Sequence, residues 1–429
     1  MATFRGLFLL AGLFVQASTA SQQCSWDPRE AILTCSLTWR QSTARLTFAK
    51  HQREATSVLK IECSSDDFKS QKRLRVDYGG GRWRQDNLWP HLQGLEVKNC
   101  PLASIGVVLD GLSLENRRGN DILRDVIKPI LGGRSLAGLR HLTLSKSQGV
   151  DAGESDFSSD LWCEVGSNLV SLNLSSNGMT KVPNTASTTN GSCPHFGLQR
   201  LEVLNLADNA LSRLQDNNPA SLLALSASSL THLDLSRNRL QSLMTSAFNS
   251  LKFVDVSENK LTSWPSLLKV VSASASSLQE LHAQGNQMAN LSLAASEAVI
   301  GSVITFDSLV VLNLSRNALE GMQGLASLGL KQLVALDLSY NRLKSLQMSN
   351  GLDSLQVLSL SHNQLVSLGS LASLTRLHVL VLSHNNLDEK GLTVTNNSRS
   401  RDPPASVLRH MADLRSLSLD HNRLKSLPR

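Results

Sequence analysis

Few residues of this sequence have the types and spacing that catalysis needs. His362, His384 and His421 each stand directly before an asparagine of a recurring sequence frame, which indicates solvent-facing repeat positions rather than a general base. The sequence contains no G-x-S-x-G and no H-E-x-x-H motif, which are local signatures of serine hydrolases and zinc peptidases. We predict no enzymatic activity, no catalytic residue, no cofactor and no metal site.

One group of larger side chains is a candidate ligand surface. Glu280, His282 and Gln284 take alternate positions in one copy of the frame, and Phe253 and Asp255 take matching positions in the copy before it. At the central position of the other copies the sequence mostly has Asn, Asp or Ser. Large, mixed side chains favour protein contact, and drift within a degenerate repeat is the alternative explanation.

Six cysteines precede the most regular part of the sequence: Cys24, Cys35, Cys63, Cys100, Cys163 and Cys193. An even number in a secreted chain predicts disulfides, although six cysteines allow fifteen connectivities. The first two flank one short loop, the middle two end successive strand-like segments, and the last two bracket the first regular repeat. We therefore predict pairing in sequence order. A zinc site is the alternative, but the sequence has no C-x-x-C pair.

Five N-x-S/T sequons predict N-linked glycans: Asn173, Asn190, Asn290, Asn313 and Asn396. Asn190, Asn290 and Asn396 fall in expected loops. Asn173 and Asn313 fall within expected strands, where an unmodified Asn of an L-N-L-S repeat is the alternative interpretation.

The elements that position these residues follow one repeated frame. Ten segments match the pattern L-x-x-L-x-L-x-x-N-x-L, and the clearest runs from Leu333 to Leu346. Such a frame predicts a stack of turns in which each L-x-L segment is a short parallel strand with inward leucines, while the Asn bonds the backbone of adjacent turns. We expect an α/β leucine-rich repeat solenoid (horseshoe), with a parallel β-sheet on the concave face and irregular or short helical outer segments.

The first twenty residues predict a secretory signal peptide. They hold one basic residue, Arg5, an apolar run from Leu7 to Val15, and small residues before the expected cleavage site. No later segment reaches the roughly 18 apolar residues that a membrane helix needs. A formal net charge of +7 over 429 residues is mild, so no nucleic-acid partner is expected. We predict the secretory pathway and a cell-surface or secreted location.

The sequence divides into four expected segments. Residues 1–20 are the signal peptide, and residues 21–58 are a disulfide-clipped N-terminal cap. Irregular leucine-rich repeats with insertions follow over 59–168. Their return segments, the parts of the chain that lead from one strand to the next, are long at 64–91 and 103–135. Regular repeats fill 169–429 and are expected to be incomplete at the C-terminus.

The first two hundred residues resemble a known receptor family. Cys24-Ser-Trp26 and the strand LKIEC, then LEVKNCPL with Cys100 in the asparagine position, and LWCEVGSNLVSLNLSSN from Leu161 resemble the amino-terminal part of arthropod Toll and Toll-like receptor ectodomains. The later repeats fit many extracellular repeat proteins.

The resemblance implies a glycoprotein receptor of innate immune or developmental signalling. Such an ectodomain binds a protein ligand, often a cystine-knot cytokine, or a partner receptor, and signals as a dimer through a membrane helix and a cytoplasmic TIR domain. This sequence has no such helix or domain, so a membrane connection would need a segment absent from this chain. The alternatives are a secreted or matrix-associated leucine-rich repeat adhesion protein and a soluble decoy.

Overall fold

The computed structural model describes most of the chain in separate stretches. They are residues 21–38, 43–47, 50–63, 73–77, 89–100, 105–109, 112–114, 138–145, 166, 168–182, 198–214, 222–243, 248–292, 304–346, 351–394 and 405–426. Contacts divide the chain into two compact units, the first with residues 1–138 and 146–149 and the second with residues 139–145 and 150–429. The first twenty residues, Cys163, Cys193, Asn190 and Asn396 lie outside the described residues.

The described residues of the first unit form two groups of strands. One is β1 (Ser21–Asp27), β2 (Ile32–Thr38), β4 (Val58–Cys63) and β6 (Gly94–Lys98), in which β1 and β2 pair antiparallel while β2, β4 and β6 pair in parallel. The short helix α1 (Lys50–Ala55) precedes β4. Inward side chains such as Leu59 and Val97 are fully buried, so the irregular repeats stack as the LKIEC and LEVKNC segments predict.

A second sheet of the first unit combines one strand of the expected cap with strands of the two long return segments. Its strands are β3 (Thr43–Thr47), β5 (Arg73–Asp77), β7 (Ile105–Leu109) and β8 (Leu112–Leu114), in that order. The first three pair in parallel, and β8 turns back antiparallel to β7. The two long return segments therefore contain strands that the repeat frame did not predict.

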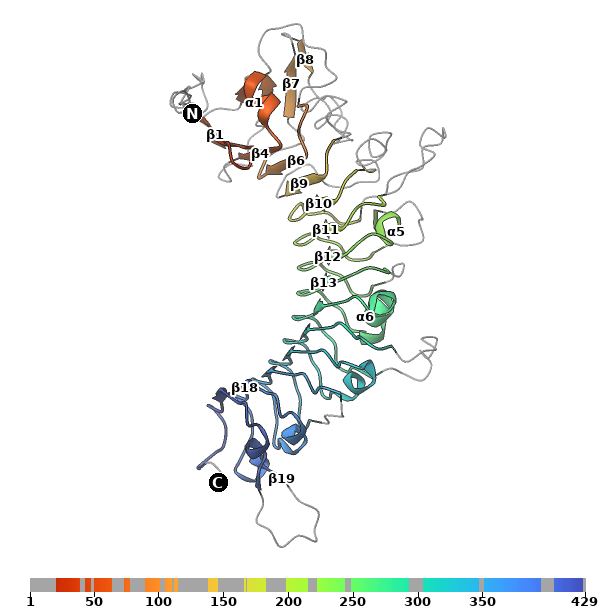
Figure 1. Ribbon diagram of the computed structural model, residues 1–429, viewed down its shortest axis with the longest axis vertical. Helices are drawn as coiled ribbons and strands as arrows, with labels where there is room; N and C mark the ends of the chain where they lie inside the picture. The colour runs from red at the N-terminus through yellow and green to blue at the C-terminus, as the bar shows by residue number, and fades with distance from the viewer. Residues whose placement is uncertain are drawn as a thin grey trace, which may run out of the picture. The chain divides into compact units, whose positions relative to one another are not determined.

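The second unit is a stack of parallel strands, drawn from yellow to blue in Figure 1. They are β9 (His141–Ser145), β10 (Ser171–Asn173), β11 (Val203–Asn205), β12 (His232–Asp234), β13 (Phe253–Asp255), β14 (Glu280–His282), β15 (Val311–Asn313), β16 (Ala335–Asp337), β17 (Val357–Ser359), β18 (Val379–Val381) and β21 (Ser416–Ser418). Each pairs in register with the next, so the inward residues form one continuous column from Leu142 to Leu417. The ten predicted copies of the frame each form one of these strands.

The frame asparagines join neighbouring turns through backbone hydrogen bonds, as predicted. Asn341 is typical: its amide nitrogen donates to the carbonyls of Leu314 and Leu338 at 3.0 Å each, and its amide oxygen accepts from the Leu319 N–H at 2.9 Å. Asn341 is 7% exposed, so these bonds satisfy an amide that would otherwise be buried without partners.

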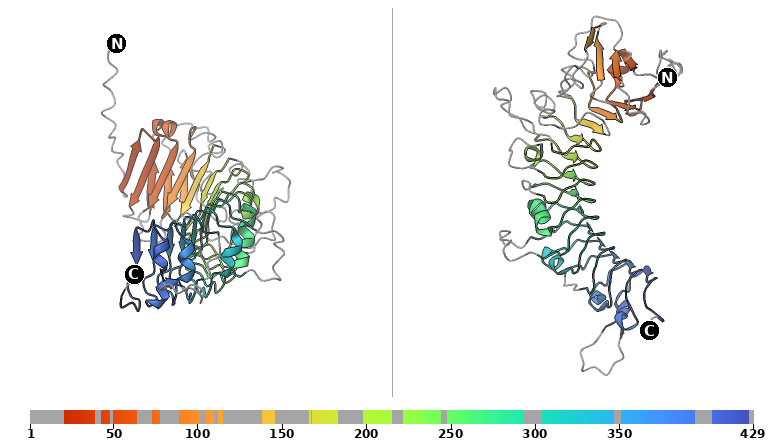
Figure 2. Two further views of the ribbon diagram at one scale, coloured as in Figure 1. Left: turned by 60° about the horizontal axis from the view of Figure 1, so that its bottom comes forward. Right: turned by 180° about the vertical axis from the view of Figure 1, so that it is seen from behind.

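Short helical segments occupy the outer side of the second unit, opposite the strands (Figures 1 and 2). They are α5 (Leu222–Ser226), α6 (Trp264–Val271), η4 (Ser272–Ser274), η6 (Gln323–Leu328), η7 (Gly369–Ser373), η8 (Lys390–Leu392) and η9 (Val407–His410). The small hairpin of β19 (Thr393–Val394) and β20 (Ala405–Ser406) lies in the last long insertion. Helix α6 begins after Ser263, whose hydroxyl accepts from the Ser266 N–H.

The expected α/β leucine-rich repeat architecture is therefore present: a many-stranded parallel sheet with short helical outer segments. The predicted segment boundaries at residues 20, 58 and 168 stay predictions. Within the described part of the chain, no helix is long and apolar enough to cross a membrane.

Candidate functional site

Two residues of each short strand face away from the leucine core, and they form two columns across the sheet. The first column contains His232, Phe253 and Glu280 on successive strands, and the second contains Asp255 and His282. These side chains are partly or largely exposed. The parallel register thus brings residues of three separate turns onto one solvent-facing surface.

An aromatic row, defined here as His232, Phe253 and His282, runs across β12, β13 and β14. The ring centroids of His232 and Phe253 are 6.0 Å apart with an interplanar angle of 22°. The centroids of Phe253 and His282 are 5.4 Å apart with an angle of 42°. These separations are in the range in which aromatic rings attract one another. The row is therefore an ordered aromatic strip with one apolar ring, Phe253, at its centre.

Polar partners fix the two histidines at the ends of the row. His282 Nε2 lies 3.1 Å from Glu280 Oε2, so the ring donates this nitrogen's proton to the carboxylate. His232 Nδ1 lies 2.8 Å from the Thr231 hydroxyl oxygen. That hydroxyl donates to the Glu202 carbonyl at 3.0 Å, so it accepts from the His232 ring.

The small polar residues of the second column have a local structural role. Asp255 Oδ1 accepts from the Ser257 N–H at 2.8 Å, and Asp234 Oδ1 accepts from the Ser236 N–H at 3.0 Å. The same bond forms at Asn173, Asn205, Asn313 and Asp337. Each side chain therefore holds the backbone as it leaves the strand. His282 replaces this acceptor with a ring, which makes its turn different from its neighbours.

Contacts between side chains join some, but not all, of the residues predicted for the candidate ligand surface. Phe253, His282 and Glu280 form one connected group, and Asp255 pairs in register with His282. Gln284 follows β14, and its buried Oε1 has no hydrogen-bond partner among the residues that the structure describes. His232 was not among the predicted residues. Its place in the same column as Phe253 was the sequence signal that could have identified it.

The three described sequons differ in exposure. Asn290 is exposed after the β14 turn, whereas Asn173 and Asn313 are half-buried in their strands. Asn313 pairs in register with His282, so a glycan there would stand directly beside the aromatic row. Its side-chain oxygen accepts from the Ser315 hydroxyl at 2.8 Å. Glycan occupancy at all five sequons stays a prediction.

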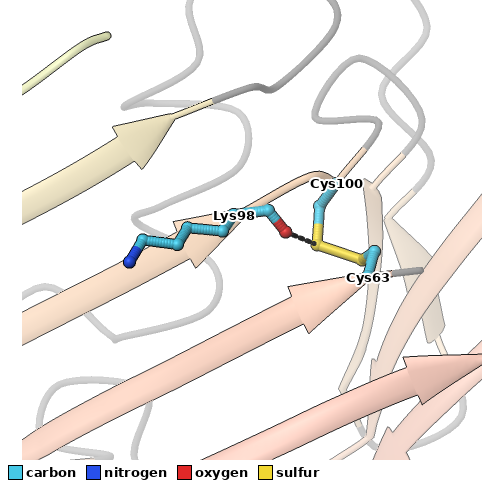
Figure 3. The surroundings of a disulfide bond; sticks show 3 residues. All are labelled: Cys63, Lys98 and Cys100. Atoms are coloured by element: carbon cyan, nitrogen blue, oxygen red, sulfur yellow. Dashed lines mark hydrogen bonds between the residues drawn. A yellow bond between two sulfur atoms is a disulfide. The ribbon is translucent and has the colours of Figure 1, made fainter. Parts of the chain in front are cut away.

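Two disulfides lie in the first unit. One joins Cys24 to Cys35 across the β1–β2 hairpin, and the other joins Cys63 at the end of β4 to Cys100 after β6. Both are pairs expected from sequence order. Figure 3 shows Cys100 Sγ facing the Lys98 carbonyl oxygen, 3.3 Å away. A disulfide sulfur has no proton to donate, so this is a close polar contact.

A second ordered group lies at the positions just before the frame asparagines. We call Arg316, Tyr340, His362, His384 and His421 the rim row. The Arg316 guanidinium carbon lies 4.7 Å from the centre of the Tyr340 ring. The following ring centroids are 4.0, 4.0 and 4.1 Å apart with interplanar angles of 11° to 13°. All five residues have φ of 53° to 55°, the left-handed region that non-glycine residues seldom adopt.

Neighbouring groups shift two pKa values near the end of this row. Desolvation, followed by the nearby His384, lowers the pKa of His362 below its ordinary value. A hydrogen bond from the Ser418 hydroxyl is the main cause that lowers the pKa of Asp420. The Ser418 hydroxyl bonds Asp420 Oδ1, whereas Asp420 Oδ2 lies 4.0 Å from His421 Nε2.

Comparison with known proteins gives the same architecture. Residues 307–365 match the family model "Leucine rich repeat", residues 353–390 match "Leucine Rich repeats (2 copies)", and residues 229–251 match "Leucine Rich Repeat". None of these descriptions names an enzyme family. No curated protein gives a significant match to the sequence.

Several solved structures are similar. A leucine-rich repeat protein of Leptospira interrogans has a TM-score of 0.52 and 24% identity, over 83% of this chain and 80% of that one. The APL1 leucine-rich repeat domain has a TM-score of 0.50 and 17% identity, over 92% and 83% of the two chains. TLR13, in its complex with ssRNA13, has a TM-score of 0.48 and 19% identity, over 90% and 57%. The first two matches show a shared fold, and at identities below 25% they show the fold alone. The family models therefore show leucine-rich repeats over residues 229–251 and 307–390, and the in-register strands and the asparagine bonds between turns show the same repeat fold along the second unit.

Proposed function

We propose that this chain is the ligand-binding region of an extracellular receptor of the Toll-like kind, and that it binds a protein on the strand face of its second unit. The observation that supports this most is the aromatic row with its attached Glu280. A protein ligand is also what the resemblance of the N-terminal sequence to Toll-like receptors implies.

The aromatic row has the chemistry of a protein-binding hot spot. Phe253 is the central ring, and it is half-buried between histidines on both sides. Aromatic side chains that are already ordered lose little entropy when a partner covers them. Truncation of such a central anchor typically costs an interface more than about 1 kcal/mol.

The charges around the row indicate the complementary partner. The carboxylates of Asp234, Asp255 and Glu280 surround Phe253 on its own strand and on both neighbouring strands. A partner that presents an apolar side chain flanked by Lys or Arg would match this arrangement in both shape and charge. Since the fixed acids are already hydrogen-bonded to backbone N–H groups, they lose little freedom on binding.

An extracellular location is supported by the first unit. The disulfides Cys24–Cys35 and Cys63–Cys100 are the kind of bond that persists in oxidising compartments. Expression in a secreting cell tests this part. We expect the protein in the medium with an N-terminus near Ser21 and with both disulfides intact in its peptide map. Retention in the cytosol with free thiols would contradict it.

Site-directed photo-cross-linking tests the binding face. A benzophenone analogue of phenylalanine replaces Phe253 in one variant and Val357 in the control. Val357 occupies the same column on β17 and is 38% exposed. In extracellular fluid of the source organism, we expect a saturable protein adduct at position 253 and none at position 357.

Affinity for the cross-linked partner then gives the quantitative test. We expect Phe253→Ala to raise Kd at least about tenfold, equivalent to about 1.4 kcal/mol, and Val357→Ala to leave it within about twofold. Equal effects of the two substitutions would contradict binding at the aromatic row. Unchanged thermal unfolding of both variants shows that a loss of affinity is not a loss of fold.

Glycan occupancy gives an independent test. Because Asn313 lies beside His282, full glycosylation at Asn313 would block the row. Mass spectrometry of the secreted protein should find Asn313 largely unmodified and the exposed Asn290 occupied. Complete occupancy at Asn313 would exclude the proposed face.

A further inference from the structure

The last two histidines of the rim row meet a carboxylate. His384 and His421 stack with centroids 4.1 Å apart, and Asp420 Oδ2 lies 4.0 Å from His421 Nε2. One potential ligand atom from each of the three residues lies within 4.8 Å of the other two. In sequence, the insertion that contains β19 and β20 separates His384 from Asp420 and His421, so the stacking of turns creates the group.

We propose that His384, His421 and Asp420 bind one divalent transition-metal ion. Two imidazole nitrogens and one carboxylate oxygen are the donor set that Zn²⁺ and its neighbours prefer, whereas Mg²⁺ and Ca²⁺ prefer oxygen donors alone. Three protein ligands leave a coordination position for water or for a group of a bound partner. The site is separate from the aromatic row and does not depend on the proposed function.

The geometry requires only small side-chain movements. In a tetrahedral site with bonds of about 2.0–2.1 Å, ligand atoms are roughly 3.4 Å apart, so these atoms must close by about an ångström. The side chains of His421 and Asp420 are 66% and 57% exposed, which leaves their torsions free to make that change. Binding would tilt the two rings out of their parallel stack, because both nitrogens must point at one ion.

The backbone beneath the side chains is already fixed. The His384 N–H donates to the Asp420 carbonyl at 3.0 Å, and the Asn422 side-chain nitrogen donates to the Leu382 carbonyl at 2.9 Å. The two turns therefore present their side chains at a constant separation. The His362 ring, 4.0 Å from that of His384, limits movement of His384 away from the site. Such prior order raises metal affinity because less freedom is lost on binding.

This proposal is tested by treating the whole purified chain with a chelator and then titrating it with CoCl2 and with ZnCl2. We expect Co²⁺ to bind at one saturable site and to give visible absorption. Zn²⁺ should displace the Co²⁺ ion and remove that absorption. The double substitution His384→Ala and His421→Ala should lower affinity at least about a hundredfold, and Asp420→Asn at least about tenfold, since even loss of an outer-shell partner costs about 10–100-fold. His410→Ala removes another exposed histidine and should leave affinity unchanged.

Chemical footprinting of the unmodified chain gives a second readout that needs no variant. Zn²⁺ should protect His384 and His421 from acylation by diethyl pyrocarbonate, with no protection of His410. No saturable Co²⁺ signal up to millimolar metal would overturn the proposal. Equal affinity of the double variant and the parent chain, or equal protection of all three histidines, would do the same.

Discussion

Removal of one frame asparagine tests how the turns are held together. Asn341→Ala deletes a buried amide that joins its own turn, after β16, to the turn of β15. The Leu319 N–H then loses its acceptor. The Leu314 carbonyl keeps a donor from Asn317, and the Leu338 carbonyl keeps one from Asn363. The Asn341 amide nitrogen also donates to the Ser339 carbonyl at 3.2 Å, and that carbonyl keeps a donor from the Arg316 N–H. Because the amide has only two protons, the damage is counted as one unpaired buried N–H and two lost hydrogen bonds.

The free-energy cost follows from these counts. An unpaired buried donor costs about 1–3 kcal/mol, and each lost hydrogen bond costs a net of about 0.5–1.5 kcal/mol. We expect Asn341→Ala to destabilise its turns by about 2–6 kcal/mol. Asn422 makes the same kinds of bond in the last described turn but is only half-buried. Water can replace its bonds, so Asn422→Ala should cost about 1 kcal/mol.

Native-state hydrogen exchange is the suitable assay because a stack of turns need not unfold in one step. The opening free energy of peptides over β15 to β17 should fall in Asn341→Ala, while peptides of the first unit keep their protection, since each turn depends mainly on its neighbours. A loss below about 1 kcal/mol, or no greater loss than in Asn422→Ala, would refute the reasoning.

Two further predictions concern backbone fit and pH. Gly324→Ala would place its new methyl group on the Leu291 carbonyl oxygen, so we expect a loss of about 3 kcal/mol or more by thermal unfolding. Gly285→Ala, where φ is +69° and only a rotatable carboxylate is near, should cost about 1 kcal/mol, and equal losses would contradict this. The Glu389 carboxylate accepts from its own N–H and from that of Lys425, which lowers its pKa below the ordinary 4.5. The stabilisation that these hydrogen bonds give the folded chain is complete above pH 4.5 and is lost as pH falls through the lower pKa of folded Glu389. Hydrogen exchange at the Lys425 N–H should show this loss. An identical pH profile in Glu389→Gln would contradict the prediction.

The regular repeats were predictable because their sequence frame specifies both the short strand of each turn and the asparagine that bonds the neighbouring turn. Each inward residue from Leu172 to Leu380 is buried and each frame asparagine bonds the backbone, and the sequence shows these requirements directly. The second sheet of the first unit was not predictable in this way. Its strand β3 lies in the expected cap, and β5, β7 and β8 lie in the long return segments, where no repeated leucine marks the register.

The candidate sites were likewise predictable only in part. Phe253 and His282 were identifiable by their size in columns of small residues, but their contact distances depend on the register between β13 and β14. The sequence placed His384 and His421 at equivalent rim positions, yet it predicted no metal site. Only the pairing of β18 with β21 across a long insertion brings these two rings together.

The in-register stacking also determines how such a surface can change during evolution. Each turn supplies one residue to every column, so a recombination event that deletes one whole turn would rejoin the leucine and asparagine columns behind it. Loss of the Phe253 turn, for example, would set His232 beside Glu280 without disturbing the register of the remaining strands. Gene segments that encode whole turns are therefore units that can be copied, removed or exchanged to alter the exposed surface, while the fold that supports them is kept.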